Sequence, residues 1–139
     1  MRFSEMAAEV IRLADARLAY WDTELPKVYP DYPIIRPNDP PTPVPPEDGM
    51  LRQFLPDLDP DVIYKLFLTM NLGRDYFAPI QLEERYAETK ANFPDVKVAV
   101  ALLAGKVMLG KYLRNGLALL SQVGVDLDQA SLEPAGNPQ

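Results

Sequence analysis

The segment Leu72–Gly73–Arg74–Asp75–Tyr76–Phe77 is the clearest candidate for binding chemistry. Glycine permits a sharp turn, and a guanidinium group beside it can present a planar fork of donors to a carboxylate or a phosphate. A simpler interpretation is that Gly73 ends a helix, Asp75 caps the next turn and Arg74 pairs internally. Arg74, Asp75 and Tyr76 therefore belong to an alternative hypothesis, in which the chain binds a small anionic ligand or acts as a weak hydrolase.

Carboxylates offer two further arrangements. Glu84 and Glu88 are one helical turn apart, but acid–base catalysis needs a buried carboxyl group with a raised pKa, and the basic neighbours here indicate a solvated face. Asp57, Asp59 and Asp61 have the spacing that begins a calcium loop, but the glycine and the distal glutamate of such a loop are missing. We expect no metal site and assign these aspartates to the start of a helix.

The residue types that the chain lacks restrict its chemistry further. Its 139 residues include no histidine and no cysteine. Disulfides, thiolate zinc sites and cysteine nucleophiles are therefore excluded, and so is imidazole, the side chain best suited to proton transfer near neutral pH. We find no phosphate-binding loop motif. We expect no cofactor and a protein that is not an enzyme.

The formal net charge of −6 argues against direct nucleic-acid binding, which draws its affinity from basic side chains. The charge is uneven, since residues 1–60 are mainly acidic whereas residues 94–121 are mainly basic. The two stretches either complement each other inside the fold or leave a basic stripe for an acidic partner. A further alternative is an acidic mimic, or inhibitor, of a nucleic-acid-binding protein.

The chain carries no pattern that targets a membrane. Residues 1–9 lack the apolar run of a signal peptide, and the longest apolar run, Val98–Gly105, lies between two lysines. That run is far shorter than the ~20 residues of a bilayer span. We expect a cytoplasmic protein that does not insert into membranes.

Apolar residues recur every three or four positions through most of the chain, which predicts helices. We expect the first helix to start at an N-cap on Ser4 and to stop before Pro26. Further helices are expected over residues 47–55, from Pro60 to Gly73, from Pro79 to residue 91, and over residues 94–121 with a break at Gly105 or Gly110.

Nine of the 15 prolines fall between Pro26 and Pro46, where a helix interior is therefore excluded. We interpret residues 24–36 as an ordered strap laid across the helices and residues 37–46 as an exposed rigid spacer. Tyr29, Tyr32, Ile34 and Ile35 are the candidate contact residues of this strap. The PxxP spacing also fits a docking ligand for an aromatic groove, but the flanking basic residue is missing, so an intramolecular strap is favoured.

These elements predict an all-α fold, a small bundle of five to six helices with the proline-rich extended strap across it. Residues 1–125 are expected to form a single helical domain whose segment 94–121 packs on the helices at 4–23 and 60–72. Gly124 is expected to cap the last helix, and residues 126–139 to form a flexible C-terminal tail.

Three stretches of the chain resemble one known family. They are Leu25–Pro33, Leu72–Phe77 and Met108–Leu117, with the sequences LPKVYPDYP, LGRDYF and MLGKYLRNGL. They are similar to an uncharacterised bacterial domain-of-unknown-function family of small helical proteins. The resemblance implies a helical fold, a bacterial source and a cytoplasmic location, and it implies no reaction and no catalytic residue.

The prediction for function follows from these exclusions and from a surplus of apolar helix that one small bundle does not fully cover. We expect a non-catalytic interaction or accessory protein, with a protein partner or self-association, as a homodimer or as a small subunit of a larger assembly.

Overall fold

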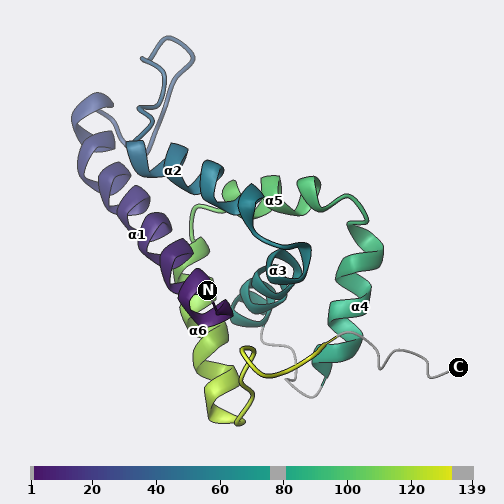
Figure 1. Ribbon diagram of the computed structural model, residues 1–139. Helices are drawn as coiled ribbons and strands as arrows, with labels where there is room; N and C mark the ends of the chain where they lie inside the picture. The colour runs from purple at the N-terminus through teal and green to yellow at the C-terminus, as the bar shows by residue number, and fades with distance from the viewer. Residues whose placement is uncertain (1, 76–80, 133–139) are drawn as a thin grey trace, which may run out of the picture.

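The computed structural model describes residues 2–75 and 81–132, and within these ranges it is all-α, as predicted (Figure 1). Six α-helices and one short 3-10 helix make up this part of the chain. Their bounds are α1 Phe3–Val28, α2 Pro46–Phe54, η1 Leu55–Asp57, α3 Pro60–Asp75, α4 Leu82–Asn92, α5 Val96–Ala104 and α6 Leu109–Gln122. The predicted helix start at Pro79 lies outside the described residues.

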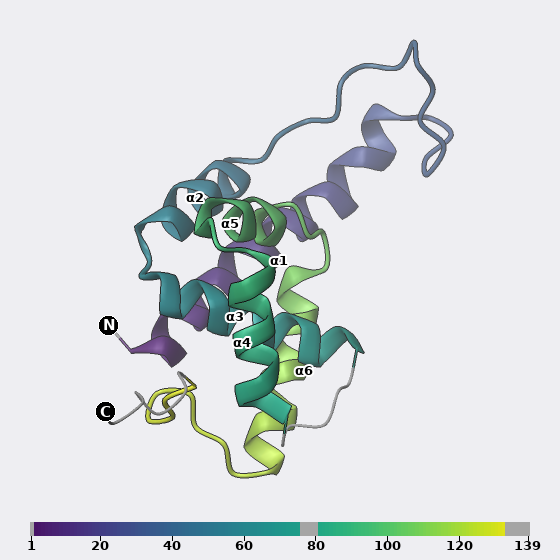
Figure 2. The same ribbon diagram turned by 90° about the vertical axis from the view of Figure 1, so that its right-hand side faces the viewer.

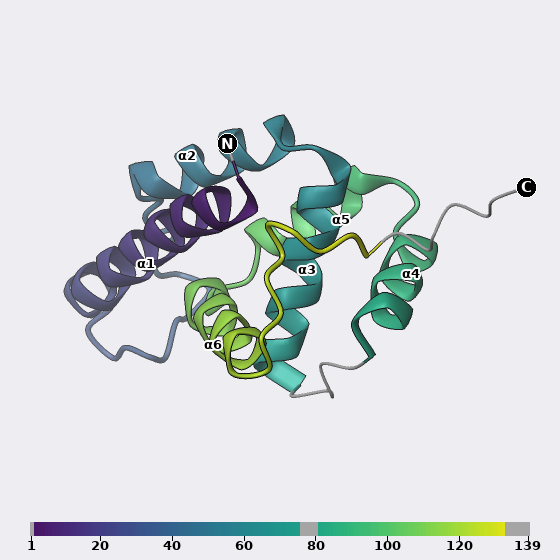
Figure 3. The same cartoon turned by 60° about the horizontal axis from the view of Figure 1, so that its bottom comes forward.

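Helix α3 forms the centre of the bundle, and every residue from Val62 to Met70 is buried. The other helices surround it, with α6, α4 and α5 in direct contact with it and α1 packed against α6 and α2 (Figures 1 and 3). A helix that is apolar around most of its circumference must be covered on all sides, which explains its central position. The predicted packing of segment 94–121 on the helices at 4–23 and 60–72 is confirmed.

Helices α3 and α6 cross at two glycines. A Cβ atom placed on Gly73 would lie 1.8 Å from the carbonyl oxygen of Tyr112, and one placed on Gly116 would lie 2.1 Å from that of Thr69. The prediction that Gly73 ends its helix is therefore wrong. Gly73 lies inside α3, where its missing side chain lets the two backbones touch.

Both expected ends of α1 differ from the structure. The N-cap is Arg2, whose backbone N–H donates to Glu5 Oε1 at 3.1 Å, and Ser4 lies inside the helix. The helix also continues through Pro26 to Val28. Pro26 and Asp22 are exposed. Proline has no N–H to donate to the Asp22 carbonyl, but water can donate to this carbonyl instead. The energetic cost of a proline inside the helix is therefore reduced.

The long C-terminal apolar segment breaks as predicted. Helix α5 ends at Ala104 with Gly105 as its C-cap, α6 begins at Leu109, and Gly110 lies buried inside α6. Gly124 has φ +75°, the N–H of Val125 donates to the Leu120 carbonyl at 2.9 Å, and the N–H of Gly124 donates to the Ser121 carbonyl at 3.1 Å. This pair of bonds is a Schellman motif, and it ends α6 as the glycine predicted.

The expected flexible tail must be corrected for the residues that the structure describes. Leu127 and Leu132 are buried, with exposed fractions of 4% each. The Lys65 ammonium donates to the carbonyls of Leu127 and Ala130, both at 3.3 Å, and the backbone N–H of Ser4 donates to Asp128 Oδ1 at 2.8 Å. Burial of two leucines outweighs the polar composition of this segment and fixes it across α3 and the start of α1.

No helix in residues 2–75 and 81–132 combines the length and the apolar composition that a bilayer span requires.

Candidate functional site

The second half of α1 extends beyond the bundle and carries the proline-rich loop, residues 29–45 (Figure 2). The buried residues of α1 end at Arg17, and none of the positions from Leu18 to Val28 is buried. The loop turns back along these last turns and leads into α2. The proline-rich segment therefore lies beside the projecting end of one helix, instead of across the bundle, and its first residues, 24–28, belong to α1.

Two aromatic side chains attach the returning part of the loop to α1. The indole Nε1 of Trp21 donates to the Pro43 carbonyl at 2.9 Å, and the hydroxyl of Tyr29 donates to the Pro40 carbonyl at 2.7 Å. The Tyr29 hydroxyl also lies 3.2 Å from Thr42 Oγ1. The two accepting carbonyls belong to prolines, whose fixed φ angles already restrict the backbone. The loop is therefore held in one conformation at its base.

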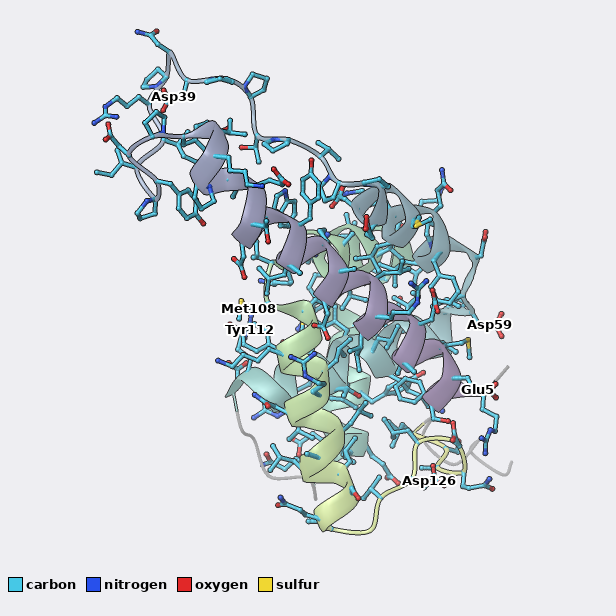
Figure 4. The ribbon with its side chains drawn as sticks, turned by 90° about the vertical axis from the view of Figure 1, so that its left-hand side faces the viewer. Glu5, Asp39, Asp59, Met108, Tyr112 and Asp126 are labelled. Carbon is cyan, nitrogen blue, oxygen red and sulfur yellow. The ribbon has the colours of Figure 1, made fainter. Side chains whose placement is uncertain are left out.

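The tip of the loop is closed by a second set of bonds. Arg36 Nη1 forms an ion pair with Asp31 Oδ2 at 2.5 Å, and the Arg36 backbone N–H donates to Asp39 Oδ2 at 2.7 Å. The N–H of Ile34 donates to the Asp31 carbonyl at 2.9 Å, which makes a turn. Figure 4 shows Asp39 at the far end of the loop, well away from Glu5 at the opposite end of α1.

The four residues predicted as contact residues of the strap have two different roles. Tyr29 is completely buried and anchors the loop. Tyr32, Ile34 and Ile35 are exposed, with fractions of 39%, 57% and 49%, and they lie in the tip of the loop, residues 31–39, together with the charged residues Asp31, Arg36 and Asp39. Their exposure contradicts the interpretation that these three residues pack against the chain's own helices. The loop extends beyond the bundle, so no helix covers them.

A buried ion pair connects this loop to the bundle, and it was not selected as a site from the sequence. Arg17 is 1% exposed, and its Nη1 lies 2.9 Å from Asp48 Oδ1 on α2. The same guanidinium donates to the carbonyls of Ala104 at 2.6 Å and Lys106 at 2.9 Å, in the turn between α5 and α6. Its Cζ atom is 5.2 Å from the ring centroid of Trp21, within the range of a cation–π contact.

Asp48 is held in its charged form by two arginines. Burial alone would raise the pKa of Asp48, but hydrogen bonds from Arg17 and from Arg52, whose Nε is 3.0 Å from Oδ2, bring the pKa below its ordinary value. A sequence signal for this site existed, because Arg17 occupies an apolar position in the helical row that contains Val10 and Leu13. A charge in such a row indicates a buried and paired residue.

Arg74 and Asp75, the candidate anion-binding pair, lie at the end of α3 and bind each other. Arg74 Nε and Nη2 donate to the two carboxylate oxygens of Asp75, each at 3.0 Å, and Nη2 also donates to Asn71 Oδ1 at 3.2 Å. The hydrogen bond from Arg74 lowers the pKa of Asp75. One donor edge of the guanidinium, Nε with Nη2, is therefore occupied by this carboxylate. Tyr76, the third residue of this hypothesis, lies outside the described residues.

The aspartates before and at the start of α3 have structural partners. Asp59 precedes the helix, and its carbonyl accepts the N–H of Ile63 at 3.1 Å. Asp61 accepts from the Tyr86 hydroxyl at 2.6 Å and pairs with Lys65 at 3.1 Å. Among residues 2–75 and 81–132 there is no group of three or more carboxylates arranged to hold a metal ion. Glu84 and Glu88 are exposed on α4, the solvated face that the sequence indicated.

Comparisons with known proteins add no relative. No family model matches the chain, and no curated protein and no solved structure is significantly similar to it. The resemblance to a bacterial family of small helical proteins therefore stays a prediction, and the functional argument depends on the geometry alone.

Proposed function

We propose that this protein is a non-catalytic interaction protein that docks onto a partner protein through the tip of its proline-rich loop. The observation that carries the proposal is the exposure of Tyr32, Ile34 and Ile35 together on a loop that projects from the bundle. In this proposal the protein acts in the cytoplasm as an accessory subunit, and the partner presents an apolar groove to the tip.

The way the loop is built supports this proposal. Hydrogen bonds from Trp21 and Tyr29 and the Arg36–Asp31 pair fix a backbone that prolines already restrict. A loop that is ordered before binding loses little conformational entropy when it docks, so more of the gain from apolar burial appears as affinity. The exposed isoleucines on this loop have no role in the packing of the bundle and are accessible to another molecule.

Chemical composition supports a role without catalysis. The chain has no imidazole and no thiol, and the guanidinium of Arg74 is already bound to a carboxylate. A small-ligand or hydrolase function would need this arginine to exchange its partner, so we favour the interaction role, although a cavity of about 400 Å³ lies beside Asp75. Acidic mimicry finds no specific support in the geometry either.

The test compares two double variants in affinity purification from the native cell, with cross-linking and quantitative mass spectrometry. Ile34→Asp with Ile35→Asp places two charges on the tip. Met50→Asp with Val123→Asp places the same charges at two exposed apolar positions elsewhere, with exposed fractions of 53% and 54%. We expect one partner to be recovered in fixed stoichiometry with the wild type and the control, and about tenfold less with the tip variant.

Equal recovery by both variants would overturn the proposed docking site. Light scattering on the purified protein identifies self-association, which the tip variant would then abolish at concentrations where the control still forms dimers. Circular dichroism of both variants checks that the helices are intact, as expected for exposed positions.

A further inference from the structure

Helix α5 is apolar on sides that the bundle does not cover. Its sequence, Val-Lys-Val-Ala-Val-Ala-Leu-Leu-Ala, contains one charged residue, and only Ala99, Leu103 and Ala104 are buried. Val98 is 48% exposed and Leu102 is 40% exposed. A helix that is apolar all around is normally enclosed, yet this one lies at the edge of the molecule, beside α2 (Figure 1).

An apolar groove of about 460 Å³ runs along one side of α5. Val96, Val100, Ala101 and Ala104 of α5 form one wall. The opposite wall consists of Ile63 of α3 and of Pro56 and Leu58, in and after η1. A groove of this size and composition is within the range of sites that take several apolar side chains.

The charged residues of the groove lining are both cationic. Arg52 comes from α2 and Lys97 from the first turn of α5. The Arg52 side chain is 50% exposed although its Nε pairs with Asp48, and Lys97 is exposed. The groove therefore has one arginine that is paired with Asp48 and one exposed lysine at its rim, and no carboxylate in its lining.

We propose that this groove binds an acidic amphipathic helix of a partner protein. Such a helix inserts apolar side chains spaced at i, i+3 or i+4 and i+7 between the walls, and its flanking carboxylates meet Arg52 and Lys97. The site is separate from the loop tip and rests on a different set of residues.

Charge distinguishes this occupant from a second copy of the chain. In a twofold dimer the same patch would face itself, so that Lys97 and Arg52 would meet a surface whose charged lining residues are again cations. Such a pairing buries apolar area but brings like charges together. A helix with carboxylates beside its apolar face satisfies both properties of the groove.

The test is a selection from a displayed library of 16-residue peptides on the immobilised full chain. The library fixes leucines at helical spacing and leaves the flanking positions free. We expect the enriched peptides to carry Asp or Glu beside the leucines and to shift amide resonances of residues 96–104 in NMR spectra. Enrichment of peptides without an acidic bias, or no enrichment at all, would overturn the proposal.

Matched variants then locate the binding. Ala101→Glu fills the groove with a charge, and Ala118→Glu makes the same change at an exposed position of α6. We expect Ala101→Glu to lower the affinity for the enriched peptides at least about tenfold, and Ala118→Glu to leave that affinity unchanged. We expect Lys97→Glu to lower the affinity for acidic peptides and to raise the affinity for basic ones, and we expect Lys111→Glu to change neither affinity. Equal affinities across each matched pair would refute the site, and dimerisation abolished by Ala101→Glu would assign the groove to a second copy instead.

Discussion

Arg17 occupies an apolar helical position, where an unpaired charge would be strongly destabilising. Its guanidinium bonds to Asp48 and to two carbonyls of the turn between α5 and α6, so α1, α2 and this turn all meet at one side chain. Removing the Asp48 carboxylate would leave the Arg17 guanidinium buried without its counter-charge. The pair therefore fixes how α2 sits on α1, the helix that carries the loop.

Asp48→Asn tests this network through its pH dependence. Because the pKa of Asp48 is lowered in the folded protein, its charge stabilises the fold at pH values above the ordinary aspartate pKa of about 3.9. That contribution disappears as the pH falls through the lowered pKa. At pH 7 we expect the variant to lose about 3 kcal/mol of unfolding free energy, measured by urea denaturation.

Urea denaturation of the wild type and Asp48→Asn at lower pH tests whether the charge of Asp48 is the cause. The difference between wild type and Asp48→Asn should be constant from pH 5 to pH 8, and it should shrink below about pH 4 as Asp48 itself becomes neutral. Asp31→Asn, in an exposed ion pair with Arg36, serves as the control and should cost at most about 1 kcal/mol. A difference that persists at low pH would show that the side-chain charge is not the cause.

At the level of the helices, the close crossing of α3 and α6 depends on two glycines. Gly73→Ala would place a Cβ against the Tyr112 backbone, so α6 must move and the surrounding core must repack. We expect a loss of at least about 1–3 kcal/mol in chemical denaturation. Gly49→Ala on α2, where a Cβ would meet no atom within 4 Å, should instead stabilise the protein by about 0.5–1 kcal/mol. Similar effects of both substitutions would contradict the crossing.

Local patterns predicted the helices better than they predicted the ends of the helices. The starts at Asp59–Pro60, the break at Gly105 and the cap at Gly124 follow from backbone chemistry within a few residues, and all three are confirmed. The sequence predicts helix ends at Pro26 and Gly73, but both residues lie inside helices. Pro26 is tolerated because it is exposed to solvent, and Gly73 is required because α6 crosses α3 there. Neither solvent exposure nor the neighbouring helix can be read from the local sequence.

The sequence predicts the residues of the candidate site but not their exposure, because exposure depends on how distant parts of the chain are placed. Tyr32, Ile34 and Ile35 were selected as contact residues because they are apolar and lie among prolines. Whether such residues pack inward or face solvent depends on where α1 ends, and the unexpected continuation through Pro26 carries them past the bundle. The helical spacing places Arg17 in an apolar row but does not identify the partners of its charge. Those partners come from α2 and from the turn between α5 and α6, which are distant in sequence.

At the level of the whole molecule, residues 125–132 join parts of the chain that are far apart in sequence. They contact the start of α1 through Ser4 and the middle of α3 through Lys65. Leu127 is 4% exposed, so Leu127→Ala should destabilise the protein by about 2–4 kcal/mol in thermal or urea unfolding. Val123→Ala, at an exposed position just before this segment, should change stability by less than about 0.5 kcal/mol. A neutral Leu127→Ala would mean that the segment is not docked in solution.

The projection of α1 has a consequence for how this molecule tolerates change. At 1.5 Å per residue its 26 residues span about 39 Å, and the positions after Arg17 contribute no buried side chain to the core. New sequences can therefore be grafted between Tyr29 and Pro40 while the stability of the helical body is retained. If the loop is the docking site proposed above, recognition depends on residues 29–45 and folding on the first half of α1, so a change in the loop can alter the partner without a loss of stability.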